Sequence, residues 1–372
     1  MISAPAKIGP HVSEVDTPAL LIELDALERN IRRMQQRIIA TKLRLRPHAK
    51  THKSTAIANM QVAAGAVGVC CQKVSEAEIM VDGGIGDVLV SNEVIGTAKL
   101  ERLAALARRA KIAVCVDDSE NVQQLAAAAE KFGANIDVLV EVNVGANRCG
   151  VDTASEVVRL ATAIARAKSL RFAGLQAYHG SAQHLRAHEE RRRAIDGAAA
   201  KVSDALGLLR RNGLECGIVS GAGTGSFEFE IESGVYTELQ VGSYVFMDAD
   251  YGRNLDHGGA PISEFENSLF VLTAVMSTAA VGRAVVDAGL KALSVDSGMP
   301  LVTDIDGISY ASASDEHGRL EIGGNHRFKL GEKIRLIPGH CDPTVNLHDW
   351  FVGIRNAHVE SVWPVSARGA VF

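Results

Sequence analysis

A short basic segment at residues 46–53 is the part of this sequence best suited to covalent chemistry. It holds Lys50 and Lys53, flanked by His48 and His52, directly after a short alternating apolar run. Neighbouring cations lower the pKa of a lysine amine, and such a lysine at a strand end is a typical Schiff-base nucleophile. Most basic clusters are only solvated loops. Taken alone, the segment is about twice as consistent with a solvated loop as with a Schiff-base lysine.

A glycine-rich turn at residues 221–226 is suited to binding a phosphate group. Backbone amides and hydroxyls in such a turn, helped by the N-terminus of the next helix, stabilise negative charge. No lysine follows the glycines, so the turn is not a Walker loop, and an ordinary tight turn explains the pattern equally well. If the turn follows the seventh strand of a barrel, the phosphate interpretation gains, with Gly242 and Ser243 as its partners.

A lysine nucleophile opposite a phosphate site suggests pyridoxal 5'-phosphate. Arg148 could donate to the cofactor ring or stack on it, and Tyr178 could pack against it. Taken singly, each has a plainer interpretation: a surface salt bridge for Arg148 and a buried core aromatic for Tyr178. Only their expected position on one rim favours the cofactor.

A second group of chemically active residues lies at His340 and Asp342. On an extended strand end the two side chains would project from one face, and Cys341 would point away. An imidazole and a carboxylate suit a divalent ion such as Mn, Mg, Co or Zn, with sites left for water and substrate. Two ligands are a weak signal, and a structural hydrogen-bonded pair is the alternative.

The elements that must position these residues follow a strict alternation. Helical, Ala/Leu/Arg-rich stretches separate eight short β-rich runs, which predicts a (β/α)8 TIM barrel; the alternative, an open doubly wound sheet, would need fewer strands and a glycine-rich first turn. The expected strands are residues 43–48, 66–71, 87–92, 112–117, 136–143, 172–179, 218–221 and 237–246. Active residues of a barrel lie at the carboxyl ends of its strands, so the polar groups above should meet on one rim.

Closely spaced apolar runs without helical spacers follow residue 262 and predict an antiparallel β domain. We therefore expect a barrel at residues 25–262 and a β domain at residues 263–372, which residues 1–24 would join. The expected strands of the β domain are residues 268–276, 284–287, 308–312, 333–337, 350–355 and 358–365.

Composition excludes several functional classes. The net charge of −5, without a basic face, argues against nucleic-acid binding. No apolar run approaches the roughly 20 residues that span a bilayer, and residues 1–10 lack a signal core, so we expect a cytoplasmic protein without membrane contact. The six cysteines show no CxxC spacing and should be reduced and mostly buried.

These motifs resemble those of the D-threonine aldolases, which belong to the fold-type III pyridoxal-phosphate enzymes together with D-serine dehydratases and alanine racemases. The dehydratases typically carry a His-x-Cys metal pair, and Asp342 stands at its third position here, which favours the aldolases. Other segments also look like 3-hydroxy-D-aspartate aldolases, and the sequence does not separate the two subgroups. The resemblance to the D-threonine aldolases runs nearly end to end and is carried by residues 46–53, 70–76, 174–180, 223–226 and 338–343. The segments that look like the 3-hydroxy-D-aspartate aldolases are residues 285–291, 294–298 and 363–369.

The resemblance implies roles for individual residues. Lys50, rather than Lys53, would bind the cofactor covalently, and Lys53 would be ordinary surface charge. His340 and Asp342 would hold the divalent metal, with manganese or magnesium ahead of cobalt or zinc. The residues around the cofactor would be Gln72, Arg148, Tyr178, Gly223, Thr224, Gly225, Gly242, Ser243 and Tyr251.

The function expected from this resemblance is reversible cleavage of a D-3-hydroxy amino acid to glycine and an aldehyde or glyoxylate. His184 is the preferred catalytic base, ahead of His52 and His179. A metal-dependent dehydratase is the main alternative, and a non-catalytic pyridoxal-phosphate-binding protein is a further one. The metal pair argues against an alanine racemase. Family likeness also implies a homodimer.

Overall fold

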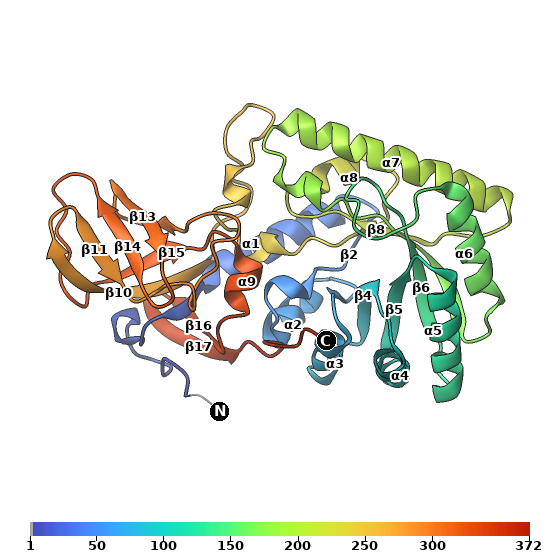
Figure 1. The fold of residues 1–372 in the computed structure, drawn as a ribbon, viewed down its shortest axis with the longest axis horizontal. Coiled ribbons are helices and arrows are strands. Elements are labelled where there is room, and N and C mark those ends of the chain that lie inside the picture. The colour runs from blue at the N-terminus through green and yellow to red at the C-terminus, as the bar shows by residue number, and fades with distance from the viewer. Residues whose placement is uncertain (1–2) are drawn as a thin grey trace.

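The computed structural model describes residues 3–372 and contains two β-sheets, each with its own helices or loops (Figure 1). An eight-stranded sheet surrounded by helices forms the larger part, and a nine-stranded sheet forms the smaller. Both agree with the predicted class. The domain boundaries themselves remain a prediction.

All eight predicted barrel strands are present, all neighbours pair in parallel, and their order is β2-β9-β8-β7-β6-β5-β4-β3. A parallel bridge between His48 and Cys70 joins the two ends of this order. The strands are β2 (Arg44–Leu45), β3 (Val69–Cys71), β4 (Asp87–Glu93), β5 (Lys111–Val116), β6 (Ile136–Glu141), β7 (Leu170–Gln176), β8 (Ile218–Gly221) and β9 (Glu238–Leu239). The predicted barrel is confirmed, although β2 and β9 are much shorter than the apolar runs from which they were predicted.

Helices alternate with the strands as predicted, and the strongly amphipathic ones bury an apolar face. The alternation implies a helix at each of these positions, although α2 and α3 are short and their apolar residues are spread around the helix. The helices are α1 (Leu24–Ile39), α2 (Thr55–Ala63), α3 (Val74–Asp82), α4 (Thr97–Leu106), α5 (Ser119–Phe132), α6 (Ala154–Arg166), α7 (His188–Arg211) and α8 (Phe227–Ser233). Short 3-10 turns interrupt the loops, among them η2 (Ala49–Thr51), η3 (Ser181–His184), η4 (Ser243–Val245) and η5 (Tyr251–Arg253).

The second sheet is antiparallel with one exception, because β1 pairs in parallel with β16 and antiparallel with β10. The sequence pattern missed the short strand β12 and also β14. The strands are β1 (Ala19–Glu23), β10 (Leu269–Ala280), β11 (Arg283–Val286), β12 (Leu301–Val302), β13 (Ile308–Ala313), β14 (Gly318–Ile322), β15 (Lys333–Ile337), β16 (Trp350–Arg355) and β17 (His358–Pro364).

The prediction that His340 and Asp342 lie together on an extended strand end is wrong. His340 is extended, but Cys341 begins the short helix α9 (Cys341–Val345), which packs against η2 of the barrel. Pro343 fits the first turn of this helix, where a backbone N–H would have no partner in the helix anyway. Thr344 Oγ1 donates to His340 O over 2.7 Å and secures the turn.

None of the described helices is long and apolar enough to cross a membrane. All six cysteines are free, four buried and two half-buried, as composition predicted.

Candidate functional site

A cavity of about 480 Å³ lies where the barrel strands end, and it collects most of the predicted site residues. The loops and turns after the strands supply its lining. The predicted residues that line it are Lys50, Gln72, Arg148, Tyr178, His184, Gly223, Thr224, Gly242, Ser243 and Tyr251. His48 and Gln176, which the strand ends were expected to bring to this rim, also line it, and so do Ser91 and Gln240, which were given no role in advance. The lining does not include His52, His179, Gly225, His340 or Asp342.

Arg148 lies over the ring of Tyr178, 5.9 Å from its centroid, with a group of acidic residues behind it. Its Nη2 is 3.9 Å from Glu141 Oε1. Burial, helped by the charge of Glu93, raises the pKa of Glu141 to about 8. At neutral pH Glu141 is therefore largely protonated, and the acidic group attracts Arg148 with less than its full charge.

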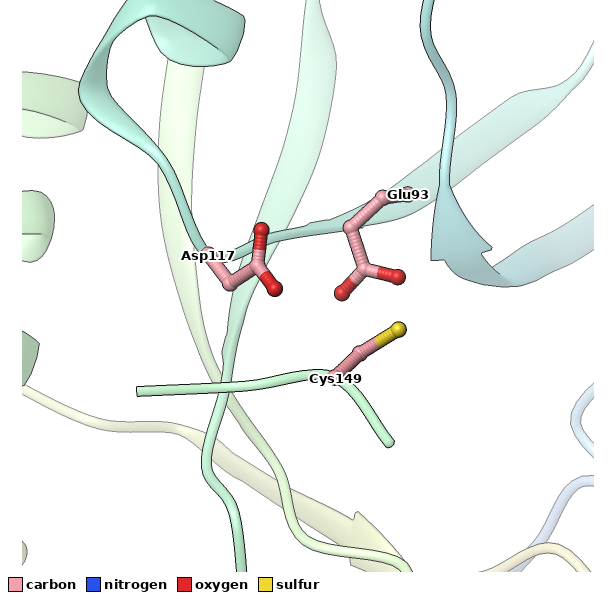
Figure 2. Close-up of side chains that lie close together, drawn as sticks. All are labelled: Glu93, Asp117 and Cys149. Carbon is pink, nitrogen blue, oxygen red and sulfur yellow. The ribbon is translucent and has the colours of Figure 1, made fainter. Parts of the chain in front are cut away.

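Glu93, Asp117 and Cys149 bring three potential metal ligand atoms within 4.8 Å of one another (Figure 2). Burial, with Glu93 beside it, raises the pKa of the Cys149 thiol to about 12. A thiol must be deprotonated to bind a metal, and without a cation Cys149 stays protonated at neutral pH. No motif in the sequence indicated this cluster, because its members lie at or beyond the ends of three different strands.

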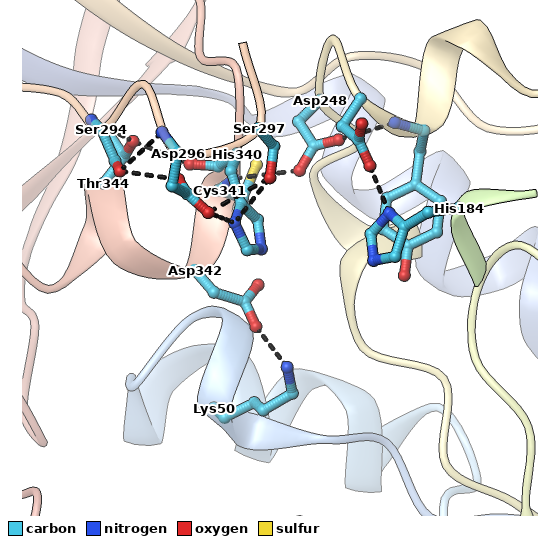
Figure 3. A network of polar contacts seen from close by, with 12 residues as sticks. Lys50, His184, Asp248, Ser294, Asp296, Ser297, His340, Cys341, Asp342 and Thr344 are labelled. Atoms are coloured by element: carbon cyan, nitrogen blue, oxygen red, sulfur yellow. Dashed lines mark hydrogen bonds and ion pairs between the residues drawn. The ribbon is translucent and has the colours of Figure 1, made fainter. Parts of the chain in front are cut away.

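Lys50 lies in η2 directly after β2, and its Nζ donates to Asp342 Oδ2 over 2.7 Å (Figure 3). The Asp342 charge raises the pKa of Lys50 and outweighs the effect of burial. Burial acts to raise the pKa of Asp342, but the charge of Lys50 holds it at about 2. The expectation that neighbouring cations lower the pKa of this lysine is wrong, because a carboxylate 292 residues away dominates.

The His340 ring is directed toward Asp342 (Figure 3), and its Nδ1 is 2.8 Å from Asp296 Oδ2. Asp342 Oδ1 is buried and accepts no hydrogen bond of normal geometry among the described residues, although the nearby Thr51 hydroxyl helps to lower the pKa of Asp342. A buried carboxylate oxygen without a partner is costly and needs an explanation. A divalent cation between His340 and Asp342 would supply one, so these two residues fit a metal site.

His184 lies at the end of η3, with its Nδ1 2.5 Å from Asp250 Oδ2. Burial acts to raise the pKa of Asp250, but hydrogen bonds from Arg186 and His184 lower it below its ordinary value. Asp250 is therefore a carboxylate that accepts the Nδ1 proton, which leaves Nε2 of His184 as the nitrogen able to accept a proton. The sequence did not single out Asp250, which is adjacent to Tyr251.

The two histidines that flank Lys50 are both held neutral. Burial, together with the Lys50 charge, lowers the pKa of His48 well below its ordinary value, and burial lowers that of His52 to about 4. His48 reaches the cavity. His52 does not, because it is fully buried with Nε2 3.2 Å from Gln61 Oε1 and Nδ1 accepting from the Ser54 amide.

The glycine-rich turn after β8 packs closely against Gln183. A Cβ on Gly225 would lie 2.7 Å from Gln183 O, and the Gly225 amide already donates to Gln183 Oε1. Gly225 thus supports the turn from behind, while Gly223 and Thr224 face the cavity. A Cβ on Gly242 would lie 2.7 Å from Thr51 Oγ1, so only glycine lets this turn approach η2.

The expectation that Lys53 is ordinary surface charge is wrong. Its side chain is 9% exposed, and its Nζ donates to Glu76 Oε1 over 2.6 Å. Glu76 Oε2 in turn accepts from the Gln72 backbone amide over 2.8 Å. Lys53 therefore stabilises the structure next to the site, because it forms a buried ion pair with Glu76.

Comparison with known proteins identifies the family of the chain. Residues 22–250 match the family described as alanine racemase, N-terminal domain, and residues 268–354 match the putative serine dehydratase domain. The chain is 53% identical to 3-hydroxy-D-aspartate aldolase of Paracoccus denitrificans, over 98% of this chain and 95% of the relative. The chain belongs to the family of D-threonine and 3-hydroxy-D-aspartate aldolases.

Two further members of this family are similar along the whole chain. D-threonine aldolase of an Arthrobacter species is 49% identical, over 98% of this chain and 96% of the relative. The crystal structure of D-threonine aldolase from Filomicrobium marinum superposes with a TM-score of 0.97 at 53% identity, covering 99% of this chain and all of that one. The chain is accordingly a carbon–carbon lyase with the fold-type III pyridoxal-phosphate architecture.

Proposed function

We propose that this protein is a pyridoxal-phosphate- and divalent-metal-dependent aldolase that cleaves D-3-hydroxy amino acids reversibly to glycine and an aldehyde or glyoxylate. Its substrates would be D-threonine, 3-hydroxy-D-aspartate or both. The observation that carries the proposal is the contact of Lys50 with Asp342, whose second oxygen is buried without a partner beside His340. It supports the proposal because the lysine that would carry the cofactor contacts a carboxylate that would hold the metal.

The cavity fits pyridoxal phosphate in size and in the chemistry of its lining. Lys50 would hold it covalently, and Gly223, Thr224, Gly242 and Ser243 would hold its phosphate, with Gly225 supporting their turn. The ring would lie among Gln72, Arg148, Tyr178 and Tyr251. When bound, the cofactor supplies an electron sink for the pair released as the bond between the α- and β-carbons breaks.

His340 and Asp342 would hold the divalent cation, with manganese or magnesium ahead of cobalt or zinc. Two protein ligands leave coordination positions for water and for the substrate's β-hydroxyl. A cation there would supply a Lewis acid that lowers the pKa of this hydroxyl.

His184 would accept the hydroxyl proton at Nε2. Asp250 holds the other nitrogen, Nδ1, and fixes the tautomer in which Nε2 carries the free lone pair. Asp250 remains a carboxylate because Arg186 and Arg253 also pair with it. His179 and His52 are weaker choices for the base, since neither lines the cavity.

The test is turnover of D-threonine, D-phenylserine and both 3-hydroxy-D-aspartate diastereomers by the pyridoxal-phosphate-loaded enzyme, before and after chelation and after Mn²⁺ is returned. We expect glycine with an aldehyde or glyoxylate, and we expect chelation to abolish cleavage. Asp342→Asn should abolish the response to Mn²⁺, whereas Glu93→Gln in the other acidic cluster should leave it intact. Cleavage unaffected by chelation would contradict the metal role.

A metal-dependent dehydratase is the second candidate, because residues 268–354 match the putative serine dehydratase domain. Asp342, in place of the cysteine that dehydratases typically carry, favours the aldolase. The same assay separates the two, since a dehydratase would release ammonia and a 2-oxo acid rather than glycine. A pyridoxal-phosphate-binding protein without activity would turn over none of these substrates. The homodimer that family likeness implies, and the cytoplasmic location, remain predictions.

A further inference from the structure

The segment at residues 294–298 joins the second sheet to the candidate metal site, and the proposed function gives it no role. Asp296, at its centre, places Oδ2 2.8 Å from His340 Nδ1. Ser294 donates to Asp296 Oδ1 over 2.7 Å, and Ser297 donates to Oδ2 over 3.1 Å. These contacts hold the Asp296 carboxylate in place, with one oxygen directed at the imidazole (Figure 3).

The backbone around this contact is also fixed. The Ser294 amide donates to Thr344 Oγ1 over 3.1 Å, and Thr344 Oγ1 donates to His340 O. A Cβ on Gly339 would overlap Gly298 O, so the segment and the chain before α9 can approach this closely only with glycine at that position. The contact between Asp296 and His340 therefore joins two segments that are already held against each other.

We propose that Asp296 is the positioning residue for the metal ligand His340. The Asp296 carboxylate accepts the Nδ1 proton, which fixes the tautomer in which Nε2 carries the lone pair and turns that nitrogen toward Asp342. This inference rests on the proposed metal site and goes further, because it assigns the cation's affinity in part to a residue that does not touch it. A carboxylate that orients a histidine ligand typically contributes 10–100-fold to metal affinity.

A neutral imidazole without this partner has two tautomers and can turn about its side-chain bonds. Ser297 Oγ is the only other group recorded near Nδ1 among the described residues, at 3.4 Å, and it is uncharged and more distant. Ser297 can therefore replace Asp296 only in part. Removing both side chains should weaken metal binding more than removing Asp296 alone.

The test is titration of the chelated, pyridoxal-phosphate-loaded protein with Mn²⁺, followed by calorimetry and by the electron paramagnetic resonance signal of free Mn²⁺. We expect Asp296→Ala to raise the Kd for Mn²⁺ about 10-fold and Asp296→Ala with Ser297→Ala to approach 100-fold. Asp296→Asn should have the smallest effect, because its amide oxygen can still accept from Nδ1. Asp304→Asn is the matched control: Asp304 lies in the same domain and pairs with Arg335, and its substitution should leave the Kd unchanged.

Two further readouts separate positioning from a general structural role. The absorbance band of lysine-bound cofactor should be unchanged in every variant, and excess Mn²⁺ should restore kcat while the Mn²⁺ concentration for half-maximal activity stays raised. A Kd within twofold of wild type in Asp296→Ala would overturn the inference and leave the metal site standing. A wild-type protein that binds no Mn²⁺ would overturn the metal site itself.

Discussion

Lys53 offers a sharp quantitative test of the structure, because the sequence alone places it at the surface. Its side chain is 9% exposed, and that of its partner Glu76 is 3% exposed. Lys53→Met would leave a buried carboxylate without its cation. Breaking a buried ion pair on one side typically costs about 3–5 kcal/mol of unfolding free energy. Glu76 keeps its hydrogen bond from the Gln72 amide, so the lower part of this range, about 3 kcal/mol, is expected.

The assay is urea denaturation at neutral pH, with each variant compared with wild type. Lys291→Met is the control: Lys291 contacts Glu316 at 2.5 Å, but the side chains are 67% and 59% exposed. An exposed pair of this kind is worth less than about 1 kcal/mol. Lys53→Met combined with Glu76→Gln should recover part of the loss, because the buried charge is then gone while an oxygen remains for the Gln72 amide.

If Lys53→Met costs no more than Lys291→Met, the reasoning from burial is refuted. The same variant also tests the choice between the two lysines. Lys53→Met should retain the absorbance band of lysine-bound cofactor, and Lys50→Ala should lose it. The reverse result would mean that Lys53 carries the cofactor.

Two further predictions concern proton transfer and pH. His184→Gln should lower kcat about 10²–10⁴-fold with the cofactor still bound. Asp250→Asn should lower kcat less, because His184 Nδ1 keeps an acceptor. Steady-state kinetics that show an unchanged kcat for His184→Gln would exclude His184 as the base. The pKa of Glu141 is about 8 in the folded protein, against 4.5 ordinarily, so the folded state binds this proton more tightly. That contribution to stability is complete below about pH 4.5 and is lost as the pH rises through about 8. Glu141→Gln should therefore reduce the fall in unfolding free energy between about pH 5.5 and about pH 8.5 by at least about 1 kcal/mol, and identical curves for variant and wild type would contradict the shift.

The barrel was predictable because its signal is local. Alternating apolar runs and amphipathic segments repeat along the chain, and parallel pairing follows from the helical crossovers between them. The rim was predictable for the same reason: once strand ends are known, residues such as Lys50 and Tyr178 must share one end of the barrel. What failed was the prediction of short or irregular structure, as in α9, where a segment expected to be an extended strand end begins a helix.

The sequence by itself determined the architecture and most of the residues that converge on the cavity. Only the tertiary structure decided the charge states and the hydrogen-bond partners of those residues. It places Asp342 against Lys50 and so raises the lysine's pKa; it buries Lys53 against Glu76; and it adds Asp250 and Asp296 behind His184 and His340. The physical reason is that charge state and hydrogen bonding depend on partners that folding brings from distant parts of the chain, and a local sequence pattern does not specify them.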